Sequence, residues 1–575
     1  MTNRNRLARF ALPLIIAAAG PGVVQGAAPA PATVTVGILA INDFHGSIEP
    51  PKQSVLAPDG KGGTVQVPAG GAAYLASAVQ TLRGQYRYSA TVSAGDLISA
   101  SQLASSIYLD EPTIGVANRI GLDFNAVGNH EFDRGRQELL RMQRGGCKQY
   151  TVRKPCQVDR FTGAKFKFLA ASTITESGRP LFPAYGLKSY GQGVRKVTVG
   201  FIGLTLKGTT DLVSPGGIKG LTFRDEAKTI NALVPQLKAK GADAVVVLIH
   251  QGGQQDKPID PSGCSGFSGD IMPILDQLDP RVDVVVSGHT HRAYVCDYAK
   301  INPAHPLLLT SSGVYGEGLT DIALEIDPAM NKVVAKRARN LIVQSVPYTG
   351  SRGPVPLSPL YPVYPADPVV AGYIQQYIDA AKVFATRPAG HLAAPASGTV
   401  LGQLIADGQL DATRPAGAQI ALMNPFGVRA PIVPADDHSV KFGDIYAAQP
   451  FNNTLVTQSL SGAELKAVLE QGFDESGPYQ ALIPSAGLSY GYDMTRPVGD
   501  RVVDLRFAGQ PIDPAATFRV TTNSFLAQGG DSFTLLARQK DGVIGISDLD
   551  ALEAWLKGTD LRPVPEALRA AEVKH

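Results

Sequence analysis

Histidines and acidic or amide residues gather at the ends of predicted strands in the first half of this 575-residue chain. Five of the nine histidines fall before residue 292, in motifs that also contain glycine, aspartate, asparagine or glutamine. A lone histidine or Gly-Asp pair at such a position is usually a hydrogen-bonded residue or a turn. Because strand carboxyl ends in α/β sheets converge to form sites, the series predicts one shared site. The motifs are Asn42-Asp43-Phe44-His45-Gly46, Gly95-Asp96, Gly128-Asn129-His130-Glu131-Phe132-Asp133, Ile249-His250-Gln251-Gly252 and Ser287-Gly288-His289-Thr290-His291.

These residue types indicate divalent metal chemistry. Carboxylate and amide oxygens with imidazole nitrogens and no thiolate suit Zn, Mn, Co or Mg better than an iron–sulfur or purely structural zinc site. Asp43 and His45 are two residues apart, which places both side chains on one side of an extended strand end. One carboxylate can hold two ions about 4 Å apart, and such a pair activates water while binding a phosphoryl oxygen. We therefore expect a two-metal site.

The elements that must position these motifs alternate between strands and helices. Ile230, Leu233, Val234 and Leu237 recur at helical spacing within residues 226–240. Continuous apolar strands separated by helices predict a sheet buried on both faces in a layered α/β domain. The predicted strands are residues 34–41, 88–93, 166–170, 197–204, 244–249, 282–286 and 307–310.

Proline and glycine interrupt this pattern over residues 346–366, which predicts a domain boundary. Residues 367–384 have the pattern of a connecting helix, and shorter strands and helices resume from about residue 386. The expected organisation is a catalytic domain at 33–345, a linker with connecting helix at 346–385, a second domain at 386–556 and a tail at 557–575.

The first 27 residues have the features of a secretory signal: three arginines, an apolar run at 10–19, and small residues near the predicted cleavage point. That run is too short to span a bilayer, which needs roughly twenty residues. Removing the segment takes the formal charge from +3 to zero, which gives no electrostatic argument for nucleic acid or anionic membrane as partner. We expect a periplasmic or secreted protein without a membrane anchor.

Four cysteines are present and none has Cys-x-x-Cys zinc spacing. Of the three possible pairings, Cys147–Cys156 with Cys264–Cys296 is favoured because each bond closes a short loop. Buried free thiols are the alternative, which an oxidising compartment disfavours.

In combination, the motifs around Asp43, Asp96, His130, His250 and His289 resemble those of the calcineurin-like metallophosphatases. The forms Asn-Asp-Phe-His-Gly and Gly-Asn-His-Glu-Phe-Asp resemble the exported 5′-nucleotidase and UDP-sugar hydrolase family. The resemblance covers nearly the whole chain after the signal segment. It implies a four-layer α/β metallophosphatase domain, a linker helix and a smaller α/β substrate-binding domain.

The resemblance also implies a role for each motif. His130 would stabilise charge on the phosphoryl group or leaving oxygen, and Asp133 would orient and charge its imidazole. The reaction implied is in-line attack by a metal-held hydroxide without a covalent enzyme intermediate. The implied ligands are Asp43, His45, Asp96 and His291 for the first ion, and Asp96, Asn129, His250 and His289 for the second, with Asp96 bridging.

Two phenylalanines of the second domain, Phe451 and Phe525, stand in polar, loop-like settings. Taken alone, the pair fits core packing better than a stacking platform for a planar base. The resemblance implies that the two rings sandwich a nucleobase and that Asp531 binds ribose. It likewise implies that Asn424 and Arg429 contact base and phosphate, a task suited to the planar guanidinium.

The chain departs from the family pattern in two places. Pro425-Phe426 stands where a glycine-rich turn is usual, and the segment 395–403 lacks the family's second phosphate-binding arginine. Losing one charge-assisted contact costs on the order of 1.5–3 kcal/mol of binding. The departures affect the expected identity of the substrate more than the expected type of reaction.

Three hypotheses remain. The first is an exported two-metal hydrolase of nucleotides, chiefly nucleoside 5′-monophosphates, with a small nucleotide and no nucleic acid polymer as partner. The second is a 2′,3′-cyclic nucleotide phosphodiesterase, nucleotide-sugar pyrophosphatase or sulfur-ester hydrolase on the same scaffold. The third, a non-catalytic secreted nucleotide-binding protein, predicts lost ligands, whereas every expected ligand is present.

Overall fold

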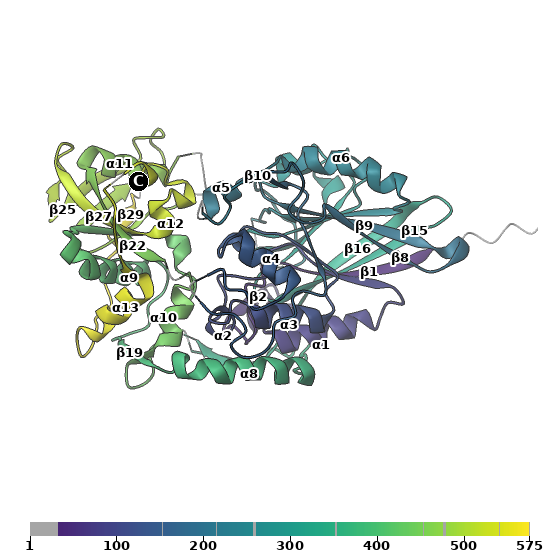
Figure 1. Cartoon of the computed structure of the whole chain (residues 1–575), viewed down its shortest axis with the longest axis horizontal. Helices are drawn as coiled ribbons and strands as arrows, with labels where there is room; N and C mark the ends of the chain where they lie inside the picture. The colour runs from purple at the N-terminus through teal and green to yellow at the C-terminus, as the bar shows by residue number, and fades with distance from the viewer. Residues whose placement is uncertain are drawn as a thin grey trace, which may run out of the picture.

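The computed structural model describes residues 33–573 except 152, 214–215, 257–259, 351–352, 452, 475–478 and 540. The predicted secretory signal lies outside the described residues. The described chain forms an N-terminal and a C-terminal domain, purple to teal and green to yellow in Figure 1, with helix α8 (Pro368–Ala385) running along one side.

Two six-stranded sheets form the N-terminal domain. In the first, β1 and β4–β6 are parallel, and β15 and β16 join on the other edge in antiparallel orientation. In the second, β9, β11, β12 and β14 are parallel, with β8 and β13 antiparallel at the edges. The strands are β1 (Val34–Ile41), β4 (Ser89–Ser93), β5 (Phe124–Ala126), β6 (Lys167–Leu169), β8 (Tyr185–Tyr190), β9 (Val197–Thr205), β11 (Ala244–His250), β12 (Val284–Ser287), β13 (Ala293–Asp297), β14 (Leu308–Ser312), β15 (Gly318–Asp327) and β16 (Lys332–Ile342).

The two sheets face each other across a core to which both contribute, for example Ile38 and Val92 from one sheet and Phe201 and Val246 from the other. Helices cover the outer faces: α1 (Ala72–Arg83), α3 (Glu111–Ile120) and α4 (Arg136–Arg144) lie over the first sheet and α6 (Glu226–Ala239) over the second. The predicted four-layer arrangement is confirmed. It follows from strands that are apolar on both faces, since each face must be covered.

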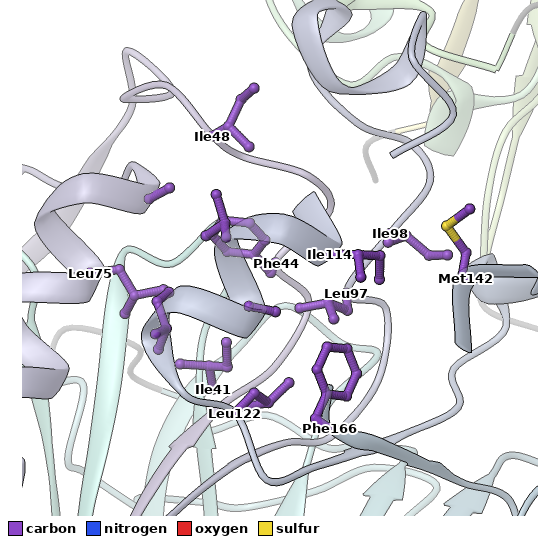
Figure 2. Packing of buried hydrophobic residues seen from close by; sticks show 14 of the residues in the cluster. Ile41, Phe44, Ile48, Leu75, Leu97, Ile98, Ile114, Leu122, Met142 and Phe166 are labelled. Carbon is purple, nitrogen blue, oxygen red and sulfur yellow. The ribbon is translucent and has the colours of Figure 1, made fainter. Parts of the chain in front are cut away.

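Figure 2 shows the outer core of the first sheet. Ile41 at the end of β1, Leu75 of α1 and Ile114 of α3 pack together with Phe44 and Leu97, which belong to the loops carrying the Asp43 and Asp96 motifs. All five side chains are 3% exposed or less. The loops that hold the candidate ligands are therefore anchored by apolar side chains within the same segments.

Helix α8 connects the domains at almost the residues predicted from the sequence. Asp367 caps its first turn by accepting a hydrogen bond from the Val370 backbone N–H at 2.8 Å, and Pro368 fits the first position, where no N–H partner is needed. The helix packs against α1, α3 and α2 (Leu103–Ser106) of the N-terminal domain and α10 (Phe442–Ala448) of the C-terminal domain.

The C-terminal domain contains a five-stranded and a four-stranded sheet with orders β23-β20-β27-β22-β28 and β26-β25-β24-β29. Within the segment expected as a tail, β29 (Ala570–Glu572) pairs with β24 (Leu488–Tyr492) in parallel. The main helices are α9 (Gly398–Thr413), α11 (Gly462–Gln471) and α13 (Asp548–Lys557). The other strands are β20 (Ile420–Met423), β22 (Thr454–Ser461), β23 (Ile483–Pro484), β25 (Val502–Phe507), β26 (Gln510–Pro511), β27 (Thr517–Asn523) and β28 (Val543–Ser547).

Both predicted disulfides form. Cys147 pairs with Cys156, nine residues away, and Cys264 pairs with Cys296, 32 residues away. No cysteine is free, so the alternative of buried thiols is wrong. Among the described residues, no helix combines the length and apolar character that crossing a membrane requires.

Candidate active site

Five of the candidate ligands lie just beyond strand ends and adopt a left-handed backbone conformation. Such a conformation costs a residue other than glycine about 1–2 kcal/mol, so it persists only where the surrounding structure fixes it. The left-handed conformation repeats among these loops, which indicates that the surrounding structure fixes the loops so that the side chains of the candidate ligands meet. The φ angles are 49° at Asp43, 46° at His45, 49° at Asp96, 72° at His289 and 57° at His291.

Asp43, His45 and His291 form one compact group of possible metal ligands. The Nε2 atoms of His45 and His291 lie 3.2 Å apart, and His291 Nε2 lies 3.5 Å from Asp43 Oδ1. His45 Nδ1 is hydrogen-bonded to the Ser99 carbonyl oxygen at 2.9 Å, which leaves Nε2 facing the group. A backbone partner of this kind fixes the ring orientation of metal-binding histidines.

Asp43 also belongs to a second group with Asp96 and His250. Asp96 Oδ2 lies 2.9 Å from His250 Nε2 and 3.7 Å from His45 Nε2, so this carboxylate adjoins both groups. His250 Nδ1 is hydrogen-bonded to the Ala94 carbonyl oxygen at 2.8 Å. The bridging role expected of Asp96 stays a prediction, and Asp43 is a second carboxylate common to both groups.

The two remaining predicted ligands, Asn129 and His289, border the second group. Asn129 Oδ1 is buried and has no hydrogen-bond partner within the described residues. The His289 ring lies 5.3 Å from the His250 ring, and its backbone N–H donates to Asp43 at 3.0 Å. Asn129 directly precedes His130, whose backbone N–H donates to Asp96 Oδ1, and an orphaned amide oxygen in this turn fits a divalent cation, because a buried polar atom without a partner is otherwise costly.

Burial sets the direction of the pKa shift at some groups of the cluster and neighbouring charges set it at others. Burial opposes the charged form of His250, but Asp96 and Asp43 outweigh it and raise its pKa to about 10. Burial raises the pKa of Asp43 to about 7 and lowers the pKa of His45 and His289 to about 3, which keeps both imidazoles neutral as metal binding requires. Burial also opposes ionisation of Asp96, but His250 and His130 outweigh it and hold its pKa well below the usual range.

His130 stands beside the two groups. Its Nδ1 lies 2.8 Å from Asp133 Oδ2, its backbone N–H donates to Asp96 Oδ1 at 2.9 Å, and its ring centroid is 5.1 Å from that of His45. Burial alone would lower the pKa of His130, but Asp133 and Asp96 raise it above the usual value. The imidazole can therefore carry a proton near neutral pH, as a residue that stabilises developing negative charge must.

Glu131 lies within a motif that the sequence identified, yet nothing in the sequence assigned it a role. Its buried carboxylate accepts hydrogen bonds from the backbone N–H groups of Asp96 at 2.9 Å, Leu97 at 2.8 Å and Gly128 at 2.6 Å. One side chain thus fixes the two loops that carry Asp96 and Asn129. Tyr315 was also missed: its ring centroid lies 5.9 Å from that of His45, and its backbone N–H donates to the Asp43 carbonyl oxygen at 2.8 Å.

The C-terminal domain brings Phe451 and Arg429 to this cluster. The Phe451 ring stacks on His130 with centroids 5.9 Å apart at 22°, and the Arg429 guanidinium lies 5.8 Å from the Phe451 centroid. Burial and the Arg429 charge hold the pKa of His291 well below its usual range. Arg429 Nη2 is buried without a hydrogen-bond partner in the described part of the chain.

The other predicted substrate residues lie close by. Asn424 Nδ2 donates to Asp531 Oδ2 at 2.8 Å, and Asn424 Oδ1 accepts from Asn523 Nδ2 at 2.9 Å. Burial raises the pKa of Asp531 to about 6. The Phe525 ring covers Gly530, where a Cβ would come within 2.5 Å of it. Among the ring contacts of the described residues, Phe451 meets His130 and does not meet Phe525.

Two family models match most of this chain. The calcineurin-like phosphoesterase model matches residues 36–293, which contain all the candidate metal ligands. The model for the C-terminal domain of 5′-nucleotidase matches residues 381–538, which contain the five predicted substrate residues.

Individual relatives agree with the models. The endonuclease YhcR of Bacillus subtilis (strain 168) is 30% identical over 539 residues, which is 92% of this chain but 40% of the relative, so this chain spans less than half of that protein. The 5′-nucleotidase of Diplobatis ommata is 24% identical over 563 residues, or 90% of this chain and 87% of the relative. The solved 5′-nucleotidase precursor from Thermus thermophilus has a TM-score of 0.72 at 25% identity, covering 94% of this chain and 100% of that chain. With this fold and this pair of matched domains, the chain belongs to the 5′-nucleotidase family of calcineurin-like phosphoesterases, a family of hydrolases.

Proposed function

We propose that this protein is an exported phosphoesterase that uses two divalent ions to hydrolyse nucleoside 5′-monophosphates to nucleoside and phosphate. One observation carries the proposal: Phe451 of the C-terminal domain stacks on His130, which itself contacts the Asp43 and Asp96 cluster, and the Arg429 guanidinium lies over the Phe451 ring. A ring for a base and a cation for a phosphate therefore adjoin the groups suited to cleavage.

Within this proposal, Asp43, His45, Asp96 and His291 hold one ion, and Asp96, Asn129, His250 and His289 hold the other. When bound, the ions supply electrophilic activation of the phosphoryl group and of the attacking water. Asp133 stabilises the protonated form of His130, and this imidazolium donates a hydrogen bond to the oxygen on which negative charge develops. The unpartnered Arg429 Nη2 donates to a phosphate oxygen, a contact that needs no rearrangement of existing hydrogen bonds within the described part of the chain.

Base and ribose recognition is assigned to the C-terminal domain. Phe451 and Phe525 offer ring faces for stacking, and Asp531, held by Asn424 at 2.8 Å, offers a carboxylate for ribose hydroxyls. Stacking tolerates every base, so the proposal does not restrict the nucleobase. The names of the Diplobatis and Thermus relatives, both 5′-nucleotidases, support this choice of substrate.

A second candidate is hydrolysis of cyclic nucleotides or nucleotide sugars. It is favoured by the absence of arginine from residues 395–403, because a single guanidinium at Arg429 binds a monoester dianion less firmly than two would. A relative from Bacillus subtilis (strain 168), named trifunctional nucleotide phosphoesterase protein YfkN, is 24% identical over 513 residues, and that name supports a wider range of nucleotide substrates.

The deciding experiment measures phosphate release from AMP, UMP, ATP, UDP-glucose and 2′,3′-cyclic AMP by metal-stripped protein with Mn, Zn, Co or Mg restored, with a coupled phosphatase to reveal diester cleavage. Metal-dependent release from AMP supports the proposal. Preference for the cyclic or sugar substrate moves the function to the second candidate. No release from any substrate with any metal contradicts both.

Two phenylalanine variants test the assigned platform. Phe451→Ala should raise KM for AMP by the loss of about 1–3 kcal/mol of stacking. Phe426→Ala is the matched control, because Phe426 belongs to the same domain and is 46% exposed. Equal KM values for the two variants would contradict the role of Phe451.

Export is tested separately, by comparing the periplasmic content of the full chain with that of a chain lacking residues 1–27.

A further inference from the structure

Arg134 directly follows Asp133 in the His130 turn, and its guanidinium binds three segments of the chain. Nη1 donates to the carboxylate of Asp110 and, at 3.2 Å, to Ser99 Oγ. Nη2 donates to Ser106 Oγ at 2.9 Å. None of these partners is a candidate metal ligand, and none of them has a part in the proposed reaction.

One branch of this network leads to the metal site. Asp110 is fully buried, accepts from the Ser99 backbone N–H at 2.9 Å and from Ser105 Oγ at 2.7 Å, and has a left-handed φ of 59°. Ser99 also has a left-handed φ, 68°, and its carbonyl oxygen is the partner of His45 Nδ1. Because strained residues persist only when their surroundings hold them, Arg134 and Asp110 together fix the loop that orients His45.

The other branch crosses to the C-terminal domain. The hydroxyls of Ser106 in α2 and Tyr446 in α10 share a hydrogen bond, and Figure 1 shows these two helices side by side. Tyr446 is 2% exposed, and its hydroxyl also lies 3.2 Å from the Pro450 carbonyl oxygen. Pro450 precedes Phe451, whose ring stacks on His130. The buried hydroxyl pair exists only while the two domains are in this arrangement.

We propose that Arg134 is a positioning residue that sets Phe451 relative to the metal site, acting through Ser106 and Tyr446 on one side and Asp110 and Ser99 on the other. The inference rests on the proposed function for the identity of the substrate. Losing the Ser106–Tyr446 bond should release the C-terminal domain from this arrangement. Hydrolysis of substrates that need Phe451 then slows, whereas hydrolysis of a small aryl phosphate that needs only the metal site does not.

The first test compares Tyr446→Phe with Tyr490→Phe. Tyr490 is a matched control, because it is buried in the same domain and its hydroxyl bonds at 2.7 Å to the Leu482 carbonyl oxygen, away from the domain boundary. We expect Tyr446→Phe to lower kcat/KM for AMP about tenfold, mainly through KM, as one lost buried hydrogen bond would. Turnover of bis(p-nitrophenyl) phosphate should stay within about twofold of wild type, since that substrate needs no contact with Phe451. Equal AMP kinetics for the two variants would overturn the inference.

A double-mutant cycle tests whether Arg134 acts through Tyr446. Arg134→Lys keeps a positive charge opposite Asp110 but loses the guanidinium fork that binds Ser106 at the same time. If the two residues act through one network, Tyr446→Phe should cost little in the Arg134→Lys background. Additive losses for AMP would overturn the coupling. Ser106→Ala leaves Arg134 paired with Asp110 and should reproduce the effect of Tyr446→Phe, which covers the case in which Arg134→Lys folds poorly.

Solution X-ray scattering separates failure of this inference from failure of the proposed function. If the wild type cleaves bis(p-nitrophenyl) phosphate but no nucleotide, the proposed function fails and the scattering curves decide the inference. A larger radius of gyration for Tyr446→Phe than for wild type and Tyr490→Phe supports it. Superimposable curves for all three proteins would overturn it.

Discussion

Replacing Glu131 with glutamine tests whether this side chain holds the Asp96 and Asn129 loops together. Glu131 Oε2 accepts from the backbone N–H groups of Asp96 and Gly128, and Oε1 accepts from that of Leu97. Glutamine has nearly the same shape but offers one acceptor oxygen, so its amide NH₂ must face at least one of these donors.

The size of the effect follows from counting these contacts. Burial and the Asp96 charge raise the pKa of Glu131 to about 7, so the comparison applies above that pH, where the carboxylate is ionised. Depending on the orientation of the amide, one or two charge-assisted hydrogen bonds are then lost, each worth about 1.5–3 kcal/mol. The N–H left without a partner is buried, because Asp96 is 1% exposed and Leu97 likewise. We expect the free energy of unfolding to fall by about 3–6 kcal/mol for two lost bonds and by about half as much for one. Metal affinity should fall about 10- to 100-fold, because the backbone N–H of Asp96 loses the carboxylate that keeps this ligand in position.

The assay is urea unfolding, with and without added metal, followed by elemental analysis of the dialysed protein. Glu176→Gln is the control, because the exposed Glu176 carboxylate pairs with Arg136 at 2.9 Å and its replacement should leave the free energy of unfolding nearly unchanged. If Glu131→Gln unfolds within about 1 kcal/mol of wild type and retains the same metal content, the reasoning is refuted.

Three further predictions concern the metal cluster, the His130 turn and a buried acid outside the site. Asp96→Ala should lose bound metal and all detectable hydrolysis, because this carboxylate adjoins both ligand groups; normal turnover with full metal content would contradict its assignment. His130→Ala should lower kcat about 10²- to 10⁴-fold with bound metal unchanged, and steady-state kinetics alongside elemental analysis measure both; loss of metal instead would make it a ligand. Burial raises the pKa of Glu317 from 4.5 to about 8, and its Oε1 has no hydrogen-bond partner among the described residues. The folded state therefore binds the extra proton, and stability should fall as pH rises from about 4.5 through 8, by at most about 5 kcal/mol. Glu317→Gln should flatten that fall between about pH 5 and pH 9 in urea unfolding, and an unchanged pH dependence would contradict it.

Local patterns were sufficient to predict the elements and the chemistry of the N-terminal domain. The run from Val34 to Ile41 and the run that begins at Ala244 are rich in apolar and β-branched residues, and both became central strands with partners on each side. Asp43 and His45 follow the first of these strands, so their place at the sheet edge was set by chain order alone. The disulfides were predictable for the same reason, since Cys147 and Cys156 are near each other in the chain.

The sequence by itself determined which residue types could bind metal and which strands would carry them, because strand ends and short loops depend on neighbours along the chain. The tertiary structure alone decided which side chains contact two segments that are far apart in the sequence. Glu131 joins two loops, Arg134 joins Asp110 to Ser106, and Phe451 meets His130 across the domain boundary. Glu131 lies within an identified motif, but neither periodicity nor motif names the partners in these contacts, because each depends on segments that approach only when the sheets and helix α8 have packed. Hydrogen bonds to buried backbone and pairs of buried side chains are fixed by that packing, which no local window of sequence contains.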